Sequence, residues 1–539
     1  MADELSQAHV LIADDAPTVR QSLRMTLAQC GINRVDAASS IGETRRRLRN
    51  AQYDAVLCDY HFGEGMNGQE LLEELRQSGE LPLYTIWIMI TAESAYEKVV
   101  AVAEIGPDDY LIKPFTSALL TQRLTLAWRR KRFLKPIYDK INEDDISGAI
   151  AEAKSLIPKA EGFRGDLMRL LSSLLLEAGQ VEQARLLFEE ILSQRMIPWA
   201  KLGLAKALIR LGKKNLAEST LQAAIVEHAQ YVDAYEELAS MYMADGRVDQ
   251  AMAVFEKCLA MTPNNVSRLQ KAGNLANMLG DSAKAKSLLE QAVKCGGNSS
   301  ALSADTVLQL ALAARRENNS SDSEKYLRLV KEIARKDNTV KNKIIDIIAT
   351  AIYEGKPQLL NELEVYFSHA EMTQEMATSF IMAADLICPA TIEGEEPSGE
   401  TPPYKWLKHI AQRFITTRHV SGLLESAATM RPIWKDYIQQ IGQEINDLNN
   451  SGVQHMLRSE YTEAIDLLLP NAQSTCNNRL MLSASHAIVK YIKNVDTLET
   501  KERNALITIA SGFIDRLSGM IDAGTHHSLN QDLQQLFQR

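Results

Sequence analysis

The sequence predicts an α/β domain with a doubly wound, five-stranded parallel sheet, followed by an all-α helical solenoid. Residues 9 to about 128 alternate short apolar segments with amphipathic ones, which is the pattern of a parallel sheet covered on both faces by helices. From about residue 136 onward strand signals vanish and helix–turn–helix pairs dominate. These pairs recur with a period of about 34 residues, so the second region is a repeat structure.

Composition narrows the class of protein. The 539 residues suggest three or four domains, and the net charge of −10 disfavours a general nucleic-acid binder, which needs a basic surface. The six cysteines are scattered without a CxxC or Cys/His cluster, so neither zinc nor a disulfide framework is indicated. No signal peptide or membrane-length apolar run is evident, and we expect a cytoplasmic protein.

Each element of the first region has a local signal. Val19, Leu23 and Leu27 recur at a four-residue spacing and mark one face of a helix. The helix over 41–50 has a basic face, which we expect to be exposed. The expected strands cover residues 10–13, 34–38, 53–59, 84–90 and 109–112, and the expected helices cover 18–30, 41–50, 69–76, 94–105 and 117–132.

Charged residues follow three of the strands. The first strand ends in Asp14-Asp15, the third ends at Asp59, and the fifth leads to Lys113. Carboxyl ends of parallel strands meet at one edge of the sheet, so these groups should converge there. Three close carboxylates repel one another unless a cation lies among them, and hard oxygen ligands suit Mg²⁺. Taken alone, the Asp14-Asp15 pair could instead cap the helix that follows.

The ordered set Asp14-Asp15, Asp59, Thr91-Ala92, Tyr110 and Lys113-Pro114 resembles the receiver domain of bacterial two-component response regulators. The resemblance implies a flavodoxin-like sheet of order 2-1-3-4-5. It implies that Asp59 accepts a phosphoryl group and that Lys113, the Thr91 hydroxyl and the Ala92 amide bind the phosphate, with Tyr110 following Thr91 as a switch. It also implies Mg²⁺ held by Asp14 or Asp15, Asp59 and the main-chain carbonyl of His61. The loop after Asp59 departs from the family, because it lacks a proline and is one residue longer.

The segment from Trp128 to Pro136 is basic. It could contact nucleic acid or a membrane, or it could be the cationic last turn of a helix, which the helix dipole favours. We prefer the second interpretation because no DNA-binding domain follows.

The repeat region shows plain self-similarity. A Gly-to-Ala hexapeptide recurs at 179–184, 212–217, 246–251 and 280–285, and a large apolar residue follows each copy at one offset: Phe188, Leu221, Phe255 and Leu289. The repeats resemble tetratricopeptide repeats (TPR). The best copy carries Tyr235, Leu238, Ala239, Tyr242, Gly246, Ala251, Phe255 and Pro263 at the motif positions.

The pattern weakens after about residue 300, and one more copy emerges near Gly452 and Ala464. We therefore expect a receiver domain over 1–132, TPR repeats over 133–300, degenerate TPR-like repeats over 301–388, a loop or linker over 389–404, and a C-terminal helical region with a late repeat and cap over 405–539. In this repeat family the first helix of each pair lines a concave groove. The groove positions map to Trp199, Leu202, Lys206, Asp233, Glu236, Gln270, Asn274 and Asn277.

The leading interpretation is a non-enzymatic response regulator. Its receiver would take phosphate from a sensor histidine kinase or phosphotransfer protein, and its solenoid would bind an unknown protein target, with a homodimer possible. One alternative is an unrecognised enzymatic output domain over 370–539, although His455, His526 and His527 lie near no motif-spaced acids. The other is a nucleic-acid-binding regulator, which the acidic balance makes the weaker choice. We expect no nucleic-acid or membrane partner.

Overall fold

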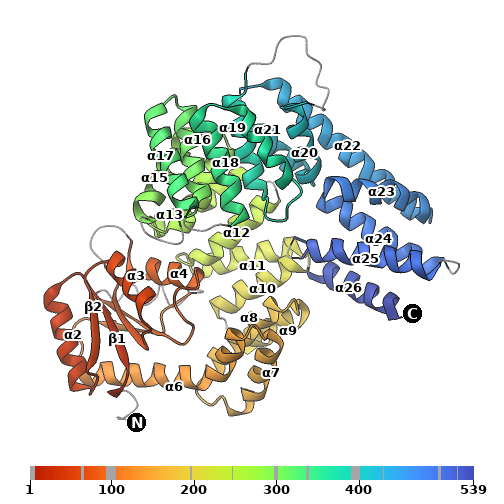
Figure 1. Ribbon diagram of the computed structural model, residues 1–539. Helices are drawn as coiled ribbons and strands as arrows, with labels where there is room; N and C mark the ends of the chain where they lie inside the picture. Colours follow the sequence, from red (N-terminus) through yellow and green to blue (C-terminus); the bar gives the residue numbers. More distant parts are fainter. Residues whose placement is uncertain are drawn as a thin grey trace. The chain divides into compact units, whose positions relative to one another are not determined.

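The computed structural model describes two compact units (Figure 1). The first comprises residues 1–272 with 291–302, and the second comprises 273–290 with 303–539. The described residues are 6–61, 66–92, 105–194, 197–245, 247–296, 302–335, 339–389, 401–428, 430–495, 499–518, 520–521 and 523–538.

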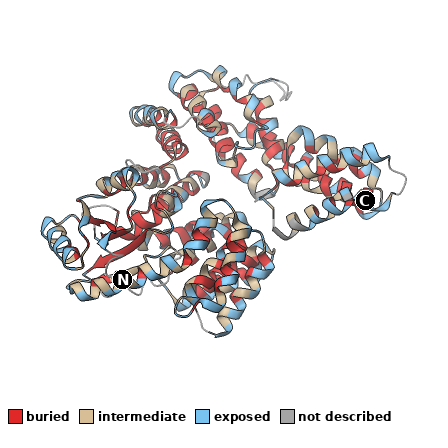
Figure 2. Cartoon of the chain, turned by 60° about the horizontal axis from the view of Figure 1, so that its bottom comes forward, coloured by how far each residue is buried: buried red, intermediate tan, exposed pale blue. Residues whose placement is uncertain are grey.

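A five-stranded parallel sheet forms the N-terminal part of the first unit. Its order is β2-β1-β3-β4-β5, as the family resemblance predicts. The strands are β1 His9–Ala13, β2 Arg34–Ala38, β3 Ala55–Asp59, β4 Ile86–Thr91 and β5 Asp109–Ile112. In register, Ala13 pairs with Cys58 and Asp59 pairs with Ile90, so the residues after β1 and at the end of β3 lie at one edge. The inner strands β1, β3 and β4 are almost wholly buried, whereas the edge strands β2 and β5 are partly exposed. Figure 2 shows the buried residues in red.

Two apolar layers lie on opposite faces of this sheet. One holds Leu23 and Leu27 of α2 (Pro17–Gln29) with Leu120 and Leu124 of α6 (Ser117–Asn142). The other holds apolar residues of α3 (Ile41–Asn50) and α4 (Gly68–Gln77). The predicted helix over 94–105 lies almost wholly outside the described residues. The alternation of strands and helices therefore positions the strand ends as the sequence predicted.

The helix α6 is longer than the sequence predicts. The sequence predicts its end at residue 132, but it continues to Asn142, with Pro136 inside it. An interior proline removes one main-chain hydrogen bond, and here the helix runs on regardless. Because α6 continues into the helical region, residue 132 marks no break in secondary structure.

Antiparallel helix pairs follow in the first unit. Gly179 and Gly212 turn between paired helices with φ of +70° and +71°, a conformation that favours glycine. The predicted apolar positions Phe188, Leu221 and Phe255 are at most 3% exposed and fill the space between helices. The helices are α7 Ile146–Leu156, a 3₁₀ turn Ile157–Lys159, α8 Arg164–Glu177, α9 Val181–Gln194, α10 Pro198–Arg210, α11 Lys214–Glu227, α12 Val232–Ala244, α13 Val248–Met261, and the parts of α14 Val266–Met278 and α15 Ser282–Gly296 that belong to this unit.

The second unit consists of further helix pairs. A helix pair lies at the predicted late repeat: Gly452 faces Leu468, where an added Cβ would lie 2.5 Å from the leucine side chain. Its helices, besides parts of α14 and α15, are α16 Ala304–Arg316, α17 Ser320–Ala334, α18 Val340–Glu354, the 3₁₀ segment Pro357–Tyr366, α19 Gln374–Ile387, α20 Tyr404–Phe414, α21 Arg418–Ala427, α22 Pro432–Leu457, α23 Tyr461–Thr475, α24 Asn478–Asn494, α25 Thr500–Arg516 and α26 Ala523–Gln538. Among the described residues, none of these helices, or those of the first unit, is long and apolar enough to cross a membrane.

Candidate functional site

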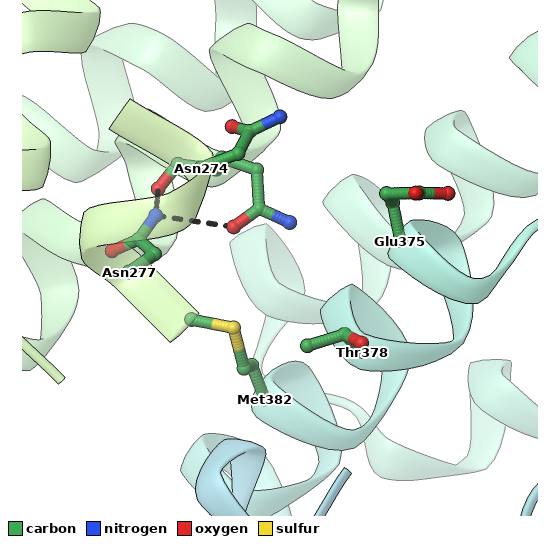
Figure 3. Close-up of a pocket in the computed structure, with 6 residues that line it drawn as sticks. Asn274, Asn277, Glu375, Thr378 and Met382 are labelled. Atoms are coloured by element: carbon green, nitrogen blue, oxygen red, sulfur yellow. Dashed lines mark hydrogen bonds between the residues drawn. The ribbon is translucent and has the colours of Figure 1, made fainter. Parts of the chain in front are cut away.

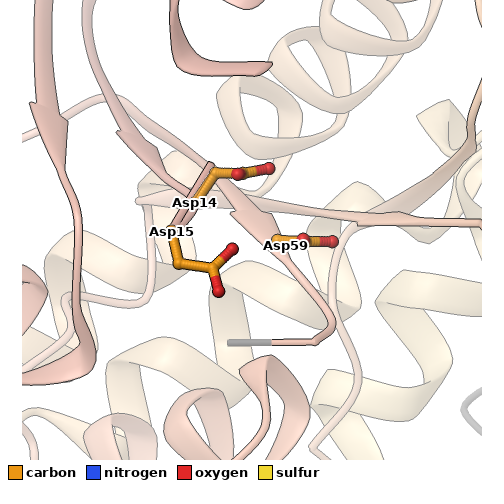
Figure 4. Close-up of side chains that lie close together, drawn as sticks. All are labelled: Asp14, Asp15 and Asp59. Atoms are coloured by element: carbon orange, nitrogen blue, oxygen red, sulfur yellow. The ribbon is translucent and has the colours of Figure 1, made fainter. Parts of the chain in front are cut away.

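Three carboxylates gather at the edge of the sheet where β1 and β3 end. Asp14 and Asp15 follow β1, Asp59 ends β3, and Figure 4 shows their side chains close together. One oxygen from each residue lies within 4.8 Å of the others. Asp14 is buried and Asp15 is exposed, so the cluster opens to solvent on one side. The predicted convergence of these residues is what the structure shows.

Lys113 supplies the balancing cation. Its Nζ lies 3.1 Å from Oδ2 of Asp14 and 3.3 Å from Oδ2 of Asp59. Burial raises the pKa of Asp59, the charge of Lys113 lowers it, and the neighbouring Asp14 raises it again, with a net upward shift. The site thus holds three acidic groups and one ammonium group, which leaves net negative charge.

The residue set fits a hard divalent cation. Carboxylate oxygens at this spacing are the ligands that Mg²⁺ prefers, and a cation among them would relieve their repulsion. Asp14 does not cap α2, because the N-cap is Ala16 and no side chain caps that helix. Instead Oδ1 of Asp14 accepts a hydrogen bond from the Ala16 amide at 2.8 Å, which leaves Oδ2 toward Lys113. The main-chain carbonyl of His61 remains a predicted ligand.

The expected phosphate-binding and switch residues border this cluster. Thr91 ends β4 and is 1% exposed, and Ala92 follows it at the surface. The Lys113 amide donates to the Thr91 carbonyl at 2.7 Å, which ties the lysine to the end of β4. Tyr110 lies in β5, half-buried against the apolar layer on the α4 side of the sheet. Their roles toward phosphate stay predictions.

The basic segment after Trp128 has a different explanation from the one the sequence favoured. It is not the last turn of a helix, because α6 runs ten residues beyond Arg132 to Asn142. Instead, Arg130 and Lys131 lie 2.7 Å and 3.1 Å from Oδ1 of Asp108. Burial alone would raise the pKa of Asp108, but Lys131 and Arg130 outweigh it and the pKa is lowered. These two cations therefore neutralise a buried carboxylate.

The predicted exposure of the basic face of α3 is wrong at Arg45. The sequence predicts an exposed basic face on α3, yet Arg45 is only 5% exposed. Its Nη2 lies 2.6 Å from Oε2 of Glu74, because α3 and α4 are neighbours on one face of the sheet.

Six of the eight predicted groove positions lie in the first unit. Leu202 is 1% exposed and lies in the core between helices, so it does not belong to an accessible groove. Trp199, Lys206 and Gln270 are half-buried. Asp233 and Glu236 on α12 bind the guanidinium group of Arg268 on α14, at 3.5 Å and 3.0 Å. Sequence reasoning missed Arg268. It lies one helical turn before Lys271, and it pairs with the two acidic groove positions.

Asn274 and Asn277 line a small cavity in the second unit (Figure 3). Its volume is about 20 Å³, room for a water molecule rather than a side chain. Nδ2 of Asn277 donates to Oε1 of Gln309 at 3.1 Å, and Thr378 and Met382 come from α19. These two asparagines therefore face neighbouring helices of their own unit.

The histidines considered for an enzymatic site have local partners. Nδ1 of His455 lies 2.7 Å from Oε2 of Glu460, five residues further along the chain. Nε2 of His526 lies 3.2 Å from the carbonyl of Ile514, and the His527 side chain lies outside the described residues. An ion pair between residues five positions apart in the sequence is an ordinary surface contact, and by itself it defines no catalytic site.

Comparison with known proteins agrees with the geometry. A model of the response regulator receiver domain matches residues 10–125, and a tetratricopeptide repeat model matches residues 202–266. The chain is 32% identical over 121 residues to chemotaxis protein CheY-3 of Vibrio cholerae, and 31% identical over 119 residues to chemotaxis protein CheY1 of Helicobacter pylori. Each match spans 92% of the relative but only 22% or 21% of this chain.

Two solved structures show a partial similarity to this chain. One is the C-terminal part of a TPR repeat-containing protein from Cytophaga hutchinsonii, with 15% identity, a TM-score of 0.34, and 48% of this chain and 96% of that chain covered. The other is a tetratricopeptide repeat protein from Parabacteroides merdae, with 14% identity, a TM-score of 0.29, and 58% and 98% covered.

A doubly wound sheet of this order, with the acidic cluster and lysine at its strand ends, defines a receiver domain. The helices that follow include tetratricopeptide repeats. The chain therefore belongs to the response regulators of bacterial two-component systems, with its receiver at the N-terminal end and TPR repeats after it.

Proposed function

We propose that the protein is a phosphorylation-controlled interaction protein. Its receiver accepts a phosphoryl group on Asp59 from a sensor histidine kinase or a phosphotransfer protein, and its repeats bind a protein target. The observation that carries the proposal is the position of Asp59, which ends β3 within reach of Asp14, Asp15 and Lys113.

Phosphoryl transfer needs a nucleophile and compensation of the charge that develops. A carboxylate oxygen of Asp59 attacks phosphorus, an O–P bond forms, and the P–N bond of the phosphohistidine donor breaks, with the electron pair returning to the imidazole. Lys113 is 3.3 Å from Oδ2 of Asp59, so its ammonium group is placed to pair with a phosphoryl oxygen. The Thr91 hydroxyl and the Ala92 amide, at the end of β4, are the donors that we assign to the remaining oxygens.

Asp14, Asp15 and Asp59 would hold the divalent cation, together with the His61 carbonyl. Mg²⁺ bound there supplies positive charge beside the phosphoryl oxygens. Arg20 donates to the main-chain carbonyls of Asp14 and Asp15 at 2.6 Å and 2.9 Å. These hydrogen bonds fix the turn after β1, and so they keep both acidic side chains at the sheet edge.

The test is labelling of the full chain by a small phosphodonor. Wild type should incorporate one phosphoryl group, and both Asp59→Asn and chelation of divalent cations should abolish incorporation while leaving the circular dichroism spectrum unchanged. Asp54→Asn is a matched control, because Asp54 lies just before the same strand and accepts the His9 amide at 2.8 Å, away from the cluster. Full labelling of the Asp59→Asn protein would overturn the assignment.

A further inference from the structure

The helix α4 of the receiver is buried on more sides than a sheet-covering helix should be. Every residue from Gly68 to Leu75 is buried, including the carboxylates of Glu70, Glu73 and Glu74 at 1%, 6% and 6% exposure. A helix on a doubly wound sheet normally buries one stripe and leaves its polar face in water. Something else therefore covers the acidic face of α4.

Glu74 pairs with Arg45 of α3, whereas Glu70 and Glu73 are covered by the start of repeat helix α14, within the same compact unit. Oε1 of Glu70 accepts a hydrogen bond from the Asn264 amide at 3.2 Å, across 194 residues of sequence. Oε2 of Glu73 accepts from Nδ2 of Asn265 at 3.1 Å and lies 2.9 Å from Nη1 of Arg268. We call these five residues, Glu70, Glu73, Asn264, Asn265 and Arg268, the docking contact.

Apolar packing joins the same two parts. Val266, the first residue of α14, is 2% exposed and belongs to the apolar layer of the receiver that contains Leu71, Leu72 and Leu75 of α4. Cys295, from the end of α15, packs against the edge of that layer. Polar and charged pairs of the docking contact thus lie beside a small apolar patch, and specific interfaces combine both kinds of contact.

Arg268 is the centre of the contact. It is 1% exposed, and it pairs with Glu73 of the receiver and with Asp233 and Glu236 of the repeats. Burial alone would lower its pKa, but these three carboxylates outweigh burial and raise it. A buried guanidinium that lost Glu73 would keep only the two repeat carboxylates, so the site has affinity for an incoming carboxylate.

The start of α4 lies against the main chain at Asp59 and Tyr60. The Gly68 amide donates to the Tyr60 carbonyl at 2.8 Å. A Cβ on Gly68 would lie 2.3 Å from the Asp59 carbonyl oxygen and 2.9 Å from Sδ of Met89, so only glycine allows this approach. A displacement of the main chain at Asp59 therefore moves the first turn of α4, which carries Glu70.

We infer that Asn264, Asn265 and Arg268 form a binding site for an acidic helix with two carboxylates one turn apart, and that α4 of the receiver is its resident occupant. Phosphorylation of Asp59 shifts α4 and loosens the docking contact. The contact is already complete in the structure, so a displacement can only weaken it. A target with the same pair of carboxylates then competes for Arg268. This regulatory step rests on the proposed function.

The experiment uses the full chain and a helix-stapled synthetic peptide of residues 66–79, which carries the sequence of α4. Binding is followed by fluorescence anisotropy. In the wild type, the tethered receiver occupies the site at high effective concentration and the peptide binds weakly. Glu73→Gln removes one charge-assisted hydrogen-bond partner from the receiver, and we expect the peptide to bind about tenfold more tightly.

Two further variants separate docking from folding. Asn265→Asp keeps the oxygen that caps α14, where Oδ1 accepts the Arg268 amide at 3.0 Å, but places a carboxylate against Glu73. It should open the contact even if Glu73→Gln misfolds. Glu80→Gln is the matched control, because Glu80 pairs with Arg49 at 2.9 Å elsewhere on the receiver; its affinity for the peptide should equal that of wild type.

The response to phosphorylation is measured on the same samples, with labelling of Asp59 recorded first. Labelled wild type should bind the peptide more tightly than unlabelled protein, and Arg268→Gln should bind it in neither state. Equal peptide affinity for Glu73→Gln, Asn265→Asp and Glu80→Gln would overturn the inference, as would labelled protein that binds no better. Failure to label Asp59 would instead contradict the proposed function and leave the variants as the test of docking.

Discussion

Glu70 makes the docking contact sensitive to pH, and the effect follows from its surroundings. Burial, with Glu73 beside it, raises the pKa of the Glu70 carboxyl from 4.5 to about 7, although the Asn67 and Asn264 amides and the charge of Arg268 oppose the shift. The other ionisable groups around it are Cys295, whose thiol pKa is raised by burial and then by Glu70, and the Arg45–Glu74 pair.

The sign of the effect follows from linkage. When α4 opens, Glu70 regains its ordinary pKa near 4.5. Between pH 4.5 and about pH 7, Glu70 is therefore mostly ionised in the open form and mostly protonated in the closed form. The closed form is therefore most stable below about pH 4.5 and loses stability as pH rises through 7. The difference between 4.5 and about 7, at about 1.4 kcal/mol for each tenfold step in the proton equilibrium, is about 3 kcal/mol.

Hydrogen exchange of the peptide 66–79 measures this opening. After correction for the intrinsic rate, protection in wild type should fall by roughly two orders of magnitude between pH 5 and pH 8. Glu70→Gln has no carboxyl to titrate, so its protection should stay nearly flat, whereas the Glu80→Gln control should follow wild type. Parallel curves for wild type and Glu70→Gln would show that Glu70 does not titrate in this range and would refute the reasoning.

Three other predictions concern separate parts of the chain. Thr91→Ala should still be labelled on Asp59 but should no longer change its affinity for the α4 peptide on labelling; a response as large as that of wild type would exclude the Thr91–Tyr110 route. Gly203→Ala should lower stability by about 1–3 kcal/mol, because its Cβ would lie 2.2 Å from the Phe188 ring. The control Gly165→Ala, whose Cβ would have nothing within 4 Å, should raise helix stability by about 0.5–1 kcal/mol. Thermal melts compare the two variants. Asp108→Asn should destabilise the receiver by about 3–5 kcal/mol, because it leaves Arg130 and Lys131 without their buried carboxylate; an unchanged urea midpoint would contradict that.

The receiver and its acidic cluster could be predicted because their signals are local. Each functional residue sits at a strand end, and parallel strands bring their carboxyl ends to one edge whatever the rest of the chain does. Asp14, Asp59 and Lys113 lie 99 residues apart at most, yet the alternation of strands and helices was enough to place them together. The core of the repeats could be predicted for the same reason, because Phe188 and Leu221 follow their Gly-to-Ala hexapeptides at the same offset.

The docking contact could not be predicted, because it depends on residues with ordinary local patterns. Glu70 and Glu73 are two of several acidic residues in the helix that the sequence predicts over 69–76, and Glu70 forms a capping box with Asn67 in the structure. Nothing in the sequence around them specifies a partner 194 residues away. The end of α6 was also predicted too early, at residue 132, because the helix continues to Asn142 with Pro136 inside it.

The central claim is that phosphorylation of Asp59 controls access to the repeats at Arg268. The most direct measurement is hydrogen exchange of residues 262–272 in the full chain, before and after labelling by a small phosphodonor, because the Asn264 amide donates to Glu70 within this segment. Exchange should rise on labelling in wild type and stay constant in Asp59→Asn treated in the same way. Labelled wild type with unchanged exchange in this segment would contradict the account.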